Sequence, residues 1–407
     1  MNVRTAGKQV AGIALCLVVF ATIAQAAPRL TPADARPLKA GLKAVEDGKL
    51  QEARSWARKI KNPLARKILN WARLSTPDPN IGFNEISTFM ATGPDWPDQR
   101  GLQRRAEEAV GKDTPDDAVL AWFLARTPLS GYGKARLGEA LLFKGRRDEG
   151  RALIRDAWIQ GNFTKAREKA FYKRHRRLLT GADHRRRLDR LLWQGRYWPA
   201  RRMLWKVPTG YRALGLARLF LRHNRGNVDT AIARVPDALK SDSGLQYERL
   251  RWRSRKGKYA SAREILNAPP DDLGRPRRWW KEREMEVRIT LREGLISESY
   301  RLARDHGLDV NLGGVTAAYA EAEWLAGWIA LRFLGAPRLA ETHFERMYNA
   351  VKYPVSLARG AYWIARSREA LDRTKVNIAA ARTWYRLAAR HPTTYYGQLS
   401  IARLRPG

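Results

Sequence analysis

The sequence has 407 residues, of which 44% are hydrophobic and 29% are charged, and its formal net charge is +37. This composition is too apolar for a disordered chain and is sufficient to bury one extended core or several small ones. So large a surplus of lysine and arginine predicts an anionic partner, unless the arginines only cover solvated helix faces. The composition leaves both interpretations open.

The first 26 residues have the pattern of a cleavable export signal. Arg4 and Lys8 precede an apolar run over residues 10–23, and an Ala-Gln-Ala tripeptide ends at Ala26. The run is shorter than the roughly 20 residues that a membrane-spanning helix needs. We therefore expect cleavage after Ala26 and a periplasmic chain without a membrane span. Loss of the two leader cations leaves a net charge of +35.

From Thr31 to Gly407, apolar residues recur three and four positions apart, and convincing two-residue alternation is missing. Short breaks rich in proline, aspartate and asparagine separate the helical stretches, as at residues 76–80, residues 269–272 and His391-Pro392. The pattern predicts helix after helix. We expect an all-α superhelical domain over residues 27–390.

A weak internal motif indicates that the helices stack as hairpins. A glycine is followed by an apolar residue two positions later and by alanine five positions later in GKLQEAR from Gly48, GRYWPAR from Gly195 and GKYASAR from Gly257. Looser copies begin at Gly145 and at Gly226, which lies 31 residues from both Gly195 and Gly257. We expect the glycine to end a helix in the left-handed conformation and the alanine to let helices approach closely. Such periods predict an irregular, curved or ring-like α-superhelix.

Three blocks near the C-terminal end resemble a known family when they are read in order. They are EWLAGWIALRFLG (323–335), HFERMYNAVKYPVSLARGAYWIARSREAL (343–371) and ARTWYRLAARHPTTYYGQLSIARL (381–404). They are similar to the end of the superhelical, non-catalytic part of soluble lytic transglycosylases. The resemblance implies a ring or horseshoe of helices that grips peptidoglycan. It also implies an attached lysozyme-like domain, in which one glutamate cleaves the MurNAc–GlcNAc bond without hydrolysis to give 1,6-anhydro products.

The catalytic motifs of that family, E-S-x-F followed by G-L-M-Q, do not occur in the 407 residues. Glu298-Ser299 is a partial match upstream of all three blocks, and we expect Glu298 to be an exposed helix residue without a catalytic role. The sequence thus favours a peptidoglycan-binding scaffold that is inactive alone, with residues 391–407 starting a linker toward an absent catalytic domain. A helical-repeat scaffold for a separately encoded catalytic domain or another envelope protein is the alternative. A truncated reading of a full enzyme is a third possibility.

Flat indole and phenol rings stack well on sugar rings, and the sequence contains 15 tryptophans. Tryptophans at helical spacing are, however, more often wedges in the core of a hairpin. The candidate glycan-binding residues are Trp324, Trp328, Tyr362, Trp363, Arg366, Tyr395, Tyr396 and Gln398.

No metal or cofactor site is predicted. His175 and His184 are nine residues apart and surrounded by arginine, and the only cysteine, Cys16, lies in the leader. No glycine-rich phosphate-binding loop occurs. Nucleic acid is not an expected partner for an exported chain. Basic clusters such as residues 185–187 and 201–202 fit either face of a superhelix.

Overall fold

The computed structural model describes residues 30–78, 80–111, 113–372 and 374–405. Within these ranges the predicted all-α fold is confirmed, with twenty-three α-helices, two 3-10 helices and no strand. The predicted leader, including Cys16, lies outside the described residues. No helix of the described ranges is long and apolar enough to cross a membrane.

The chain divides into two compact units, which meet between Leu153 and Ile154. The prediction of one superhelical domain over residues 27–390 therefore becomes two units. The helices of the first unit are α1 (Pro32–Glu46), α2 (Leu50–Lys59), α3 (Pro63–Ser75), α4 (Phe83–Thr92), α5 (Gln99–Ala109), α6 (Asp116–Leu124) and α7 (Gly131–Phe143). Helix α8 (Arg147–Gln160) contains the boundary. Leu102 and Val119, both fully buried, belong to the main core of the first unit.

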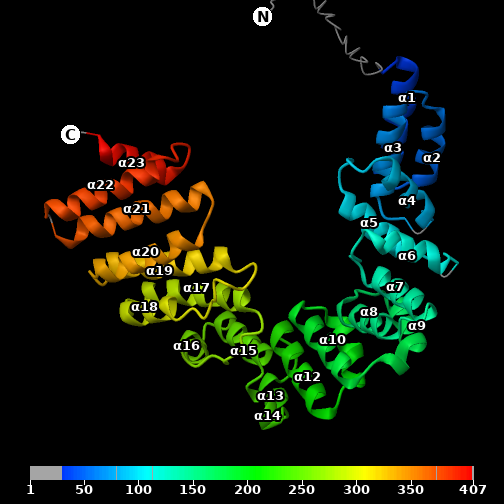
Figure 1. Ribbon diagram of the computed structural model, residues 1–407. Coiled ribbons are helices and arrows are strands. Elements are labelled where there is room, and N and C mark those ends of the chain that lie inside the picture. Colours follow the sequence, from blue (N-terminus) through cyan, green and yellow to red (C-terminus); the bar gives the residue numbers. More distant parts are fainter. Residues whose placement is uncertain (1–29, 79, 112, 373, 406–407) are drawn as a thin grey trace, which may run out of the picture. The chain divides into compact units, whose positions relative to one another are not determined.

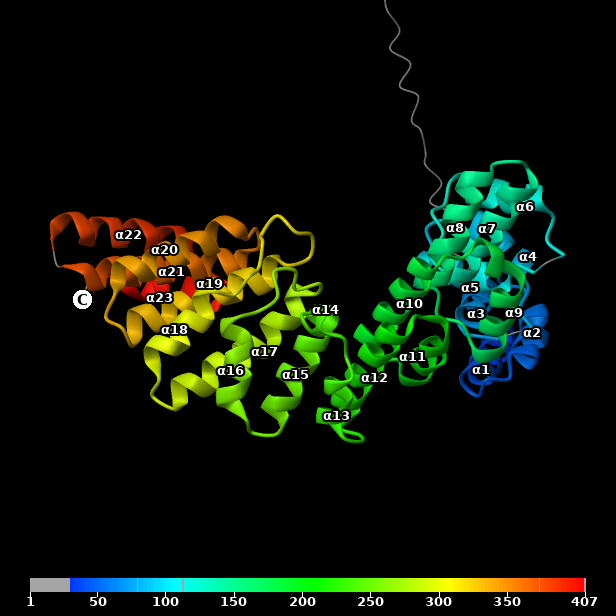
Figure 2. The same cartoon turned by 90° about the horizontal axis from the view of Figure 1, so that it is seen from below.

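The second unit contains the remaining helices. They are α9 (Lys165–His175), η1 (Arg176–Leu178), α10 (Gly181–Trp193), α11 (Tyr197–Met203), η2 (Leu204–Lys206), α12 (Thr209–His223), α13 (Val228–Ala233), α14 (Asp237–Lys240), α15 (Ser243–Arg255), α16 (Tyr259–Asn267), α17 (Pro276–Arg292), α18 (Ile296–Arg304), α19 (Thr316–Arg332), α20 (Pro337–Ala350), α21 (Pro354–Leu371), α22 (Lys375–Ala389) and α23 (Tyr395–Leu404). Helices α19 to α23 lie in successive layers (Figure 1), and α15, α16 and α17 pack side by side (Figure 2).

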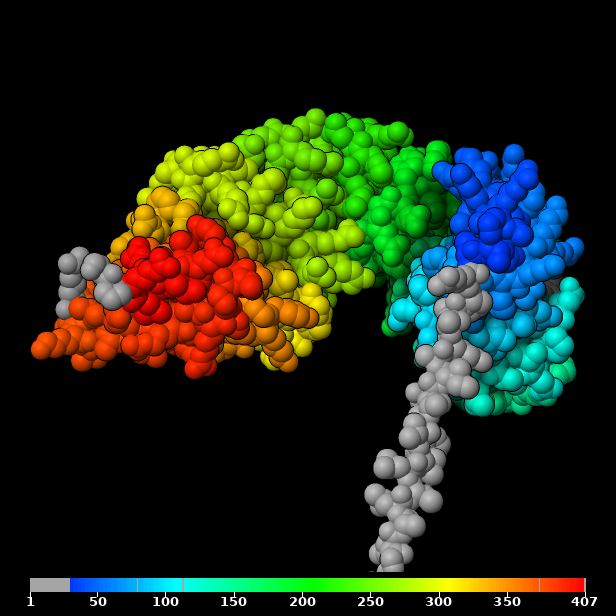
Figure 3. Space-filling view, turned by 90° about the horizontal axis from the view of Figure 1, so that it is seen from above, coloured from blue at the N-terminus to red at the C-terminus, as the bar shows by residue number. Residues whose placement is uncertain are grey.

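Residues 391–407, predicted to start a linker, instead contain α23. Thr394 caps this helix by accepting a hydrogen bond from the Gly397 N–H at 3.1 Å. Tyr396 packs its ring against Tyr362 of α21 at 5.3 Å. In the space-filling view α23, in red, lies beside the orange atoms of the preceding helices (Figure 3). Helix α23 therefore packs on the preceding helices, with its aromatic side chains in contact with theirs.

The repeat motif has the predicted geometry and is more frequent than the sequence indicated. Gly195, Gly226 and Gly257 have φ of 70°, 65° and 69°, the left-handed region that favours glycine. The small residue five positions later is fully buried at Ala200 and Ala262. Two further copies follow the same rule: Gly294 with Ser299, and Gly335 with Ala340.

Many arginines have a structural role that the sequence did not reveal. They donate to the carbonyl groups at the C-terminal ends of neighbouring helices, which lack partners within their own helix. Arg187 of α10 donates to the carbonyls of Trp158 and Gly161 at the end of α8, and Arg283 of α17 donates to Leu266 at the end of α16 at 2.8 Å. Burial lowers the pKa of Arg283 to about 10, so it remains charged at neutral pH.

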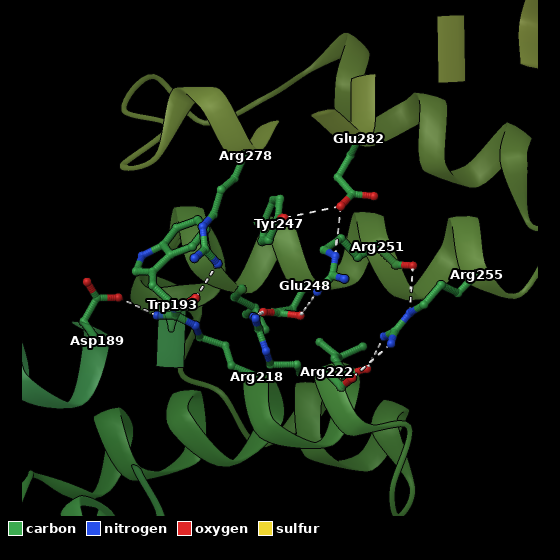
Figure 4. Close-up of polar contacts among 12 residues, drawn as sticks. Asp189, Trp193, Arg218, Arg222, Tyr247, Glu248, Arg251, Arg255, Arg278 and Glu282 are labelled. Carbon is green, nitrogen blue, oxygen red and sulfur yellow. Dashed lines mark hydrogen bonds and ion pairs between the residues drawn. The ribbon is translucent and has the colours of Figure 1, made fainter. Parts of the chain in front are cut away.

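Arginines join successive layers of the second unit both through helix-end carbonyls and through ion pairs (Figure 4). Arg255 of α15 donates to the Leu221 carbonyl at the end of α12 at 2.7 Å. Arg222 of α12 pairs with buried Glu248 of α15, and Arg251 of α15 donates to Glu282 of α17 at 2.9 Å. Part of the positive charge therefore stabilises helix packing and is not free to bind a partner.

Candidate functional site

Three of the predicted tryptophans meet between α19 and α21. The rings of Trp324 and Trp328 stack one helical turn apart, with centroids separated by 5.9 Å and planes inclined by 16°. Trp363 of α21 contacts Trp324 edge to face at 6.2 Å. Spacing of four residues on α19 places the first two rings on one helix face, and layering of α21 over α19 supplies the third.

The predicted tyrosines extend this group to α23. Tyr362, beside Trp363, contacts Tyr396 at 5.3 Å, and Tyr396 contacts Tyr395 at 5.1 Å. The structure thus brings together six of the eight predicted residues, which we call the C-terminal aromatic cluster. It consists of Trp324, Trp328, Tyr362, Trp363, Tyr395 and Tyr396.

Two arginines are held against this cluster. The Arg359 guanidinium lies 3.8 Å from the centre of the Trp324 ring and pairs with Glu321 at 2.8 Å. Arg366, a predicted site residue, donates to the Tyr362 hydroxyl at 3.3 Å and pairs with Glu369 at 3.1 Å. Both cations already have an acidic partner, so the interior of the cluster is a packed, charge-balanced layer.

The cluster is accessible mainly along one edge. Tyr395 is 70% exposed, whereas Tyr362 is only 6% exposed. Gln398, the last predicted residue, is exposed one turn beyond Tyr395, and the three tryptophans are partly buried. A sugar ring therefore has open access to α23, while the tryptophans mainly join the helices.

Helix α22, which packs against α23, carries a row of arginines that the sequence interpretation did not single out. Arg382, Arg386 and Arg390 are exposed and four residues apart on one face of α22. Among the described residues, none of them forms an ion pair. The Arg382 guanidinium lies 3.5 Å from the Leu404 carbonyl, so the row runs beside α23. Tyr395, Gln398 and these arginines together form the α22–α23 edge.

A buried polar network lies next to the cluster on α19. Glu323 is 3% exposed, and its Oε2 lies 2.5 Å from His343 Nδ1 of α20. Its other oxygen lies 3.5 Å from Nε2 of His306. On its far side, His343 Nε2 lies 2.9 Å from the hydroxyl of Tyr300 on α18. Four elements are therefore joined through one carboxylate.

The contacts of this network define its protonation. The Leu308 N–H donates to His306 Nδ1 at 2.9 Å, so that nitrogen is unprotonated and the proton of the neutral ring lies on Nε2, facing Glu323. Burial acts to raise the pKa of Glu323, but the hydrogen bonds from His306 and His343 outweigh it and lower this pKa to about 2. Glu323 is thus ionised at neutral pH. It fixes helices in place, and its burial keeps it from a large substrate.

A second group of accessible aromatic residues lies on α11 and η2, in a segment that the sequence interpretation treated as a repeat copy and, at residues 201–202, as a basic cluster. Trp198 and Trp205 are 69% and 75% exposed. They lie seven residues apart with Arg201 between them. This i, i+3, i+7 spacing is readable in the sequence, but it was not distinguished there from a buried helical stripe. We call Trp198, Arg201 and Trp205 the α11 surface.

A comparison of the chain with models of known protein families and with curated proteins finds no match to either. The function is therefore inferred from the chemistry of the two accessible surfaces, the α22–α23 edge and the α11 surface. Both combine exposed aromatic rings with arginines, and neither holds a carboxylate among the residues that define it.

Proposed function

We propose that the chain is a periplasmic scaffold that binds peptidoglycan, as the superhelical part of a soluble lytic transglycosylase does. It binds strands of sugar rings that carry peptide carboxylates, and it does not cleave them by itself. The observation that carries the proposal is the α22–α23 edge, which combines the exposed Tyr395 ring and Gln398 amide of α23 with three exposed arginines of the adjacent helix α22 that have no acidic partner among the described residues.

The chemistry of this edge fits an acidic glycan in two respects. An aromatic ring offers a flat apolar face to a sugar ring, and an amide side chain both donates and accepts hydrogen bonds from hydroxyl groups. Guanidinium groups bind carboxylates in a bidentate manner, with charge-assisted hydrogen bonds. The net charge of +35 that is expected after loss of the leader adds a long-range attraction for a polyanion, which salt weakens.

The proposal assigns no catalytic residue. Glu298, expected to be exposed, is partly buried on α18 in the repeat copy that begins at Gly294, because its carboxylate lies 3.5 Å from Arg263 and 3.8 Å from Arg301. Its contacts therefore fit a helix-packing role. Peptidoglycan retention without release of soluble sugar is the expected behaviour of the chain.

The proposal is tested by sedimenting purified sacculi with the native chain at low and at raised salt. We expect retention at low salt that falls as salt increases. The variant Arg382→Gln/Arg386→Gln/Arg390→Gln should lose most of the retention. A control with the same loss of charge, Arg36→Gln/Lys39→Gln/Arg58→Gln, alters cations on α1 and α2 and should retain much more. Absence of salt-sensitive retention of the native chain would refute the proposal.

A protein partner in the envelope is the competing function, since helical repeats commonly bind proteins. Sacculi stripped of attached proteins by protease and detergent distinguish the two. Peptidoglycan binding predicts unchanged retention on stripped sacculi. Loss of retention after stripping would assign the surface to a protein partner.

A further inference from the structure

The α11 surface is unusual in the second unit because it exposes indole rings where the neighbouring elements bury theirs. Between Phe143 and Met285, a stretch described throughout, Trp198 and Trp205 are the only exposed large hydrophobic side chains. The same short segment buries Ala200, Met203 and Leu204 against its neighbours. Its inner face therefore packs against the neighbouring helices. Its outer face carries two tryptophans that do not contribute to this buried core.

The two indoles lie on one face. Seven residues correspond to two helical turns, which places the rings on the same side and about 10 Å apart along the axis. Arg201 lies between them and is exposed. The surface is therefore a short row of side chains in which a cation lies between two aromatic rings.

Neighbouring side chains hold the rings in place. The Arg212 guanidinium lies 4.6 Å from the centre of the Trp205 ring, so it covers one face of that indole and leaves the other to solvent. Tyr197 meets Trp198 edge to face at 5.1 Å, and its hydroxyl accepts a hydrogen bond from Arg201 at 3.2 Å. Such support lowers the entropy lost when a ligand stacks on the rings.

The charge around the row is positive and not compensated. Arg196, Arg201, Lys206, Arg212 and Arg225 form no ion pair among the described residues. By contrast, the adjacent Arg202 pairs with Glu168 at 2.9 Å. Arg212 donates to the Leu204 carbonyl at the end of α11 at 3.1 Å. The other four cations are available to an anionic ligand, which distinguishes them from the arginines that cap helices.

We propose that the α11 surface is a binding site for an acidic polysaccharide strand, in which Trp198 and Trp205 stack on sugar rings and Arg201 binds a carboxylate between them. This inference rests on the proposed function and deepens it by adding a second contact for the same ligand class, separate in sequence from the α22–α23 edge. A lipid bilayer fits less well. Insertion into acyl chains is favoured by aliphatic side chains beside the tryptophans, and Met203 and Leu204 are buried.

The test uses fluorescence anisotropy of labelled, uncross-linked, peptide-bearing glycan strands. The variant Trp198→Ala/Trp205→Ala should bind them at least about tenfold more weakly than the native chain, and Arg201→Gln should weaken binding and reduce its salt dependence. Tyr353→Ala, which removes a ring that is 78% exposed elsewhere, is the matched control and should bind normally. Thermal unfolding should be unchanged in all three variants, because the altered side chains are exposed.

Each other outcome has a defined meaning. Native-like strand binding by the double tryptophan variant would overturn this inference and leave the proposed function intact. Binding to phosphatidylglycerol vesicles is measured in parallel. The inference would also fail if the double tryptophan variant lost vesicle binding but kept strand binding, because the surface would then be a lipid site. If the native chain does not bind sacculi, the proposed function fails, and polygalacturonate, an acidic polysaccharide without peptides, becomes the probe. Its binding must then depend on both tryptophans, and any other result overturns the inference.

Discussion

The carboxylate of Glu323 is the group whose environment most clearly couples stability to pH. Its pKa is about 2 in the folded chain against an ordinary value of 4.5. A carboxylate whose pKa is lower in the folded state stabilises the fold at pH values above its unfolded pKa. That stabilisation is lost as the pH falls from about 4.5 toward 2.

We therefore predict that Glu323→Gln removes part of the acid sensitivity. At neutral pH the variant should be less stable by on the order of 3 kcal/mol, because the amide cannot serve two imidazole donors as an ionised carboxylate does. Urea unfolding of both proteins at a series of pH values measures this. The two free energies of unfolding should converge as the pH falls from about 5 to about 2. Parallel curves over that range would contradict the assignment.

Arg187 gives a second prediction at the same scale. It is 1% exposed, pairs with Glu168 at 3.0 Å and donates to two carbonyls at the end of α8. Arg187→Ala should cost about 3–5 kcal/mol, because it leaves a buried carboxylate and two carbonyls short of donors. The neighbouring Arg186→Ala, at a position that is not buried, should cost within about 0.5 kcal/mol. Equal losses in chemical denaturation would show that burial does not separate their roles.

The contrast between Arg186 and Arg187 marks a limit of inference from sequence. The two residues are identical and adjacent, so composition and clustering treat them alike. Their roles diverge only because packing of α10 against α8 turns one toward carbonyl groups and leaves the other without them. The interpretation of arginine as either solvated or ligand-binding therefore missed a third role, which depends on contacts between residues about thirty positions apart.

At the scale of elements, the hairpin motif was predictable because it is local. A glycine that ends a helix and a small residue one turn into the next helix act through backbone geometry and close approach, which neighbouring residues determine. The copies at Gly294 and Gly335 were missed because Ser299 replaces alanine in one and Pro337 replaces the earlier apolar residue in the other. Serine is accommodated since its hydroxyl donates to the Val287 carbonyl at 2.9 Å.

The motif predicts a specific cost for its glycine. Gly257 has φ of +69° and open space where the methyl group of an alanine would lie, so Gly257→Ala is opposed by backbone conformation alone. We expect a loss of about 1–2 kcal/mol. Gly313→Ala is the control, because Gly313 also has open space but no positive φ, and it should be neutral or slightly stabilising. Similar shifts in the unfolding midpoint for both variants would contradict the explanation.

The sequence predicted which helices form the candidate site better than it predicted which of their residues are accessible. The three C-terminal blocks do bring six predicted aromatic residues together, because helical spacing and sequential layering are local rules. Exposure depends on which neighbour covers each ring, and it separates Tyr395 from Tyr362 although both were proposed on equal terms. The exposed indoles of Trp198 and Trp205 were overlooked for the same reason.

For the whole molecule, the central property is the surplus of positive charge. What matters for binding is which of the cations have no acidic partner within the described chain. Helix-end contacts and ion pairs engage many arginines, and those without an acidic partner among the described residues include the arginines of the α22–α23 edge and those around the α11 surface. A ligand that combines sugar rings with carboxylates uses both features of these surfaces. A neutral glycan uses only the rings, and a simple polyanion uses only the charge.

The most direct measurement is therefore a calorimetric titration of the native chain with two glycans of similar length at increasing salt. One is the uncross-linked peptide-bearing strand, and the other is a neutral chitooligosaccharide. We predict that the peptide-bearing strand binds at least about tenfold more tightly at low salt and that this advantage shrinks as salt screens the charges. No binding of the peptide-bearing strand, or equal and salt-independent binding of both, would contradict the proposed function.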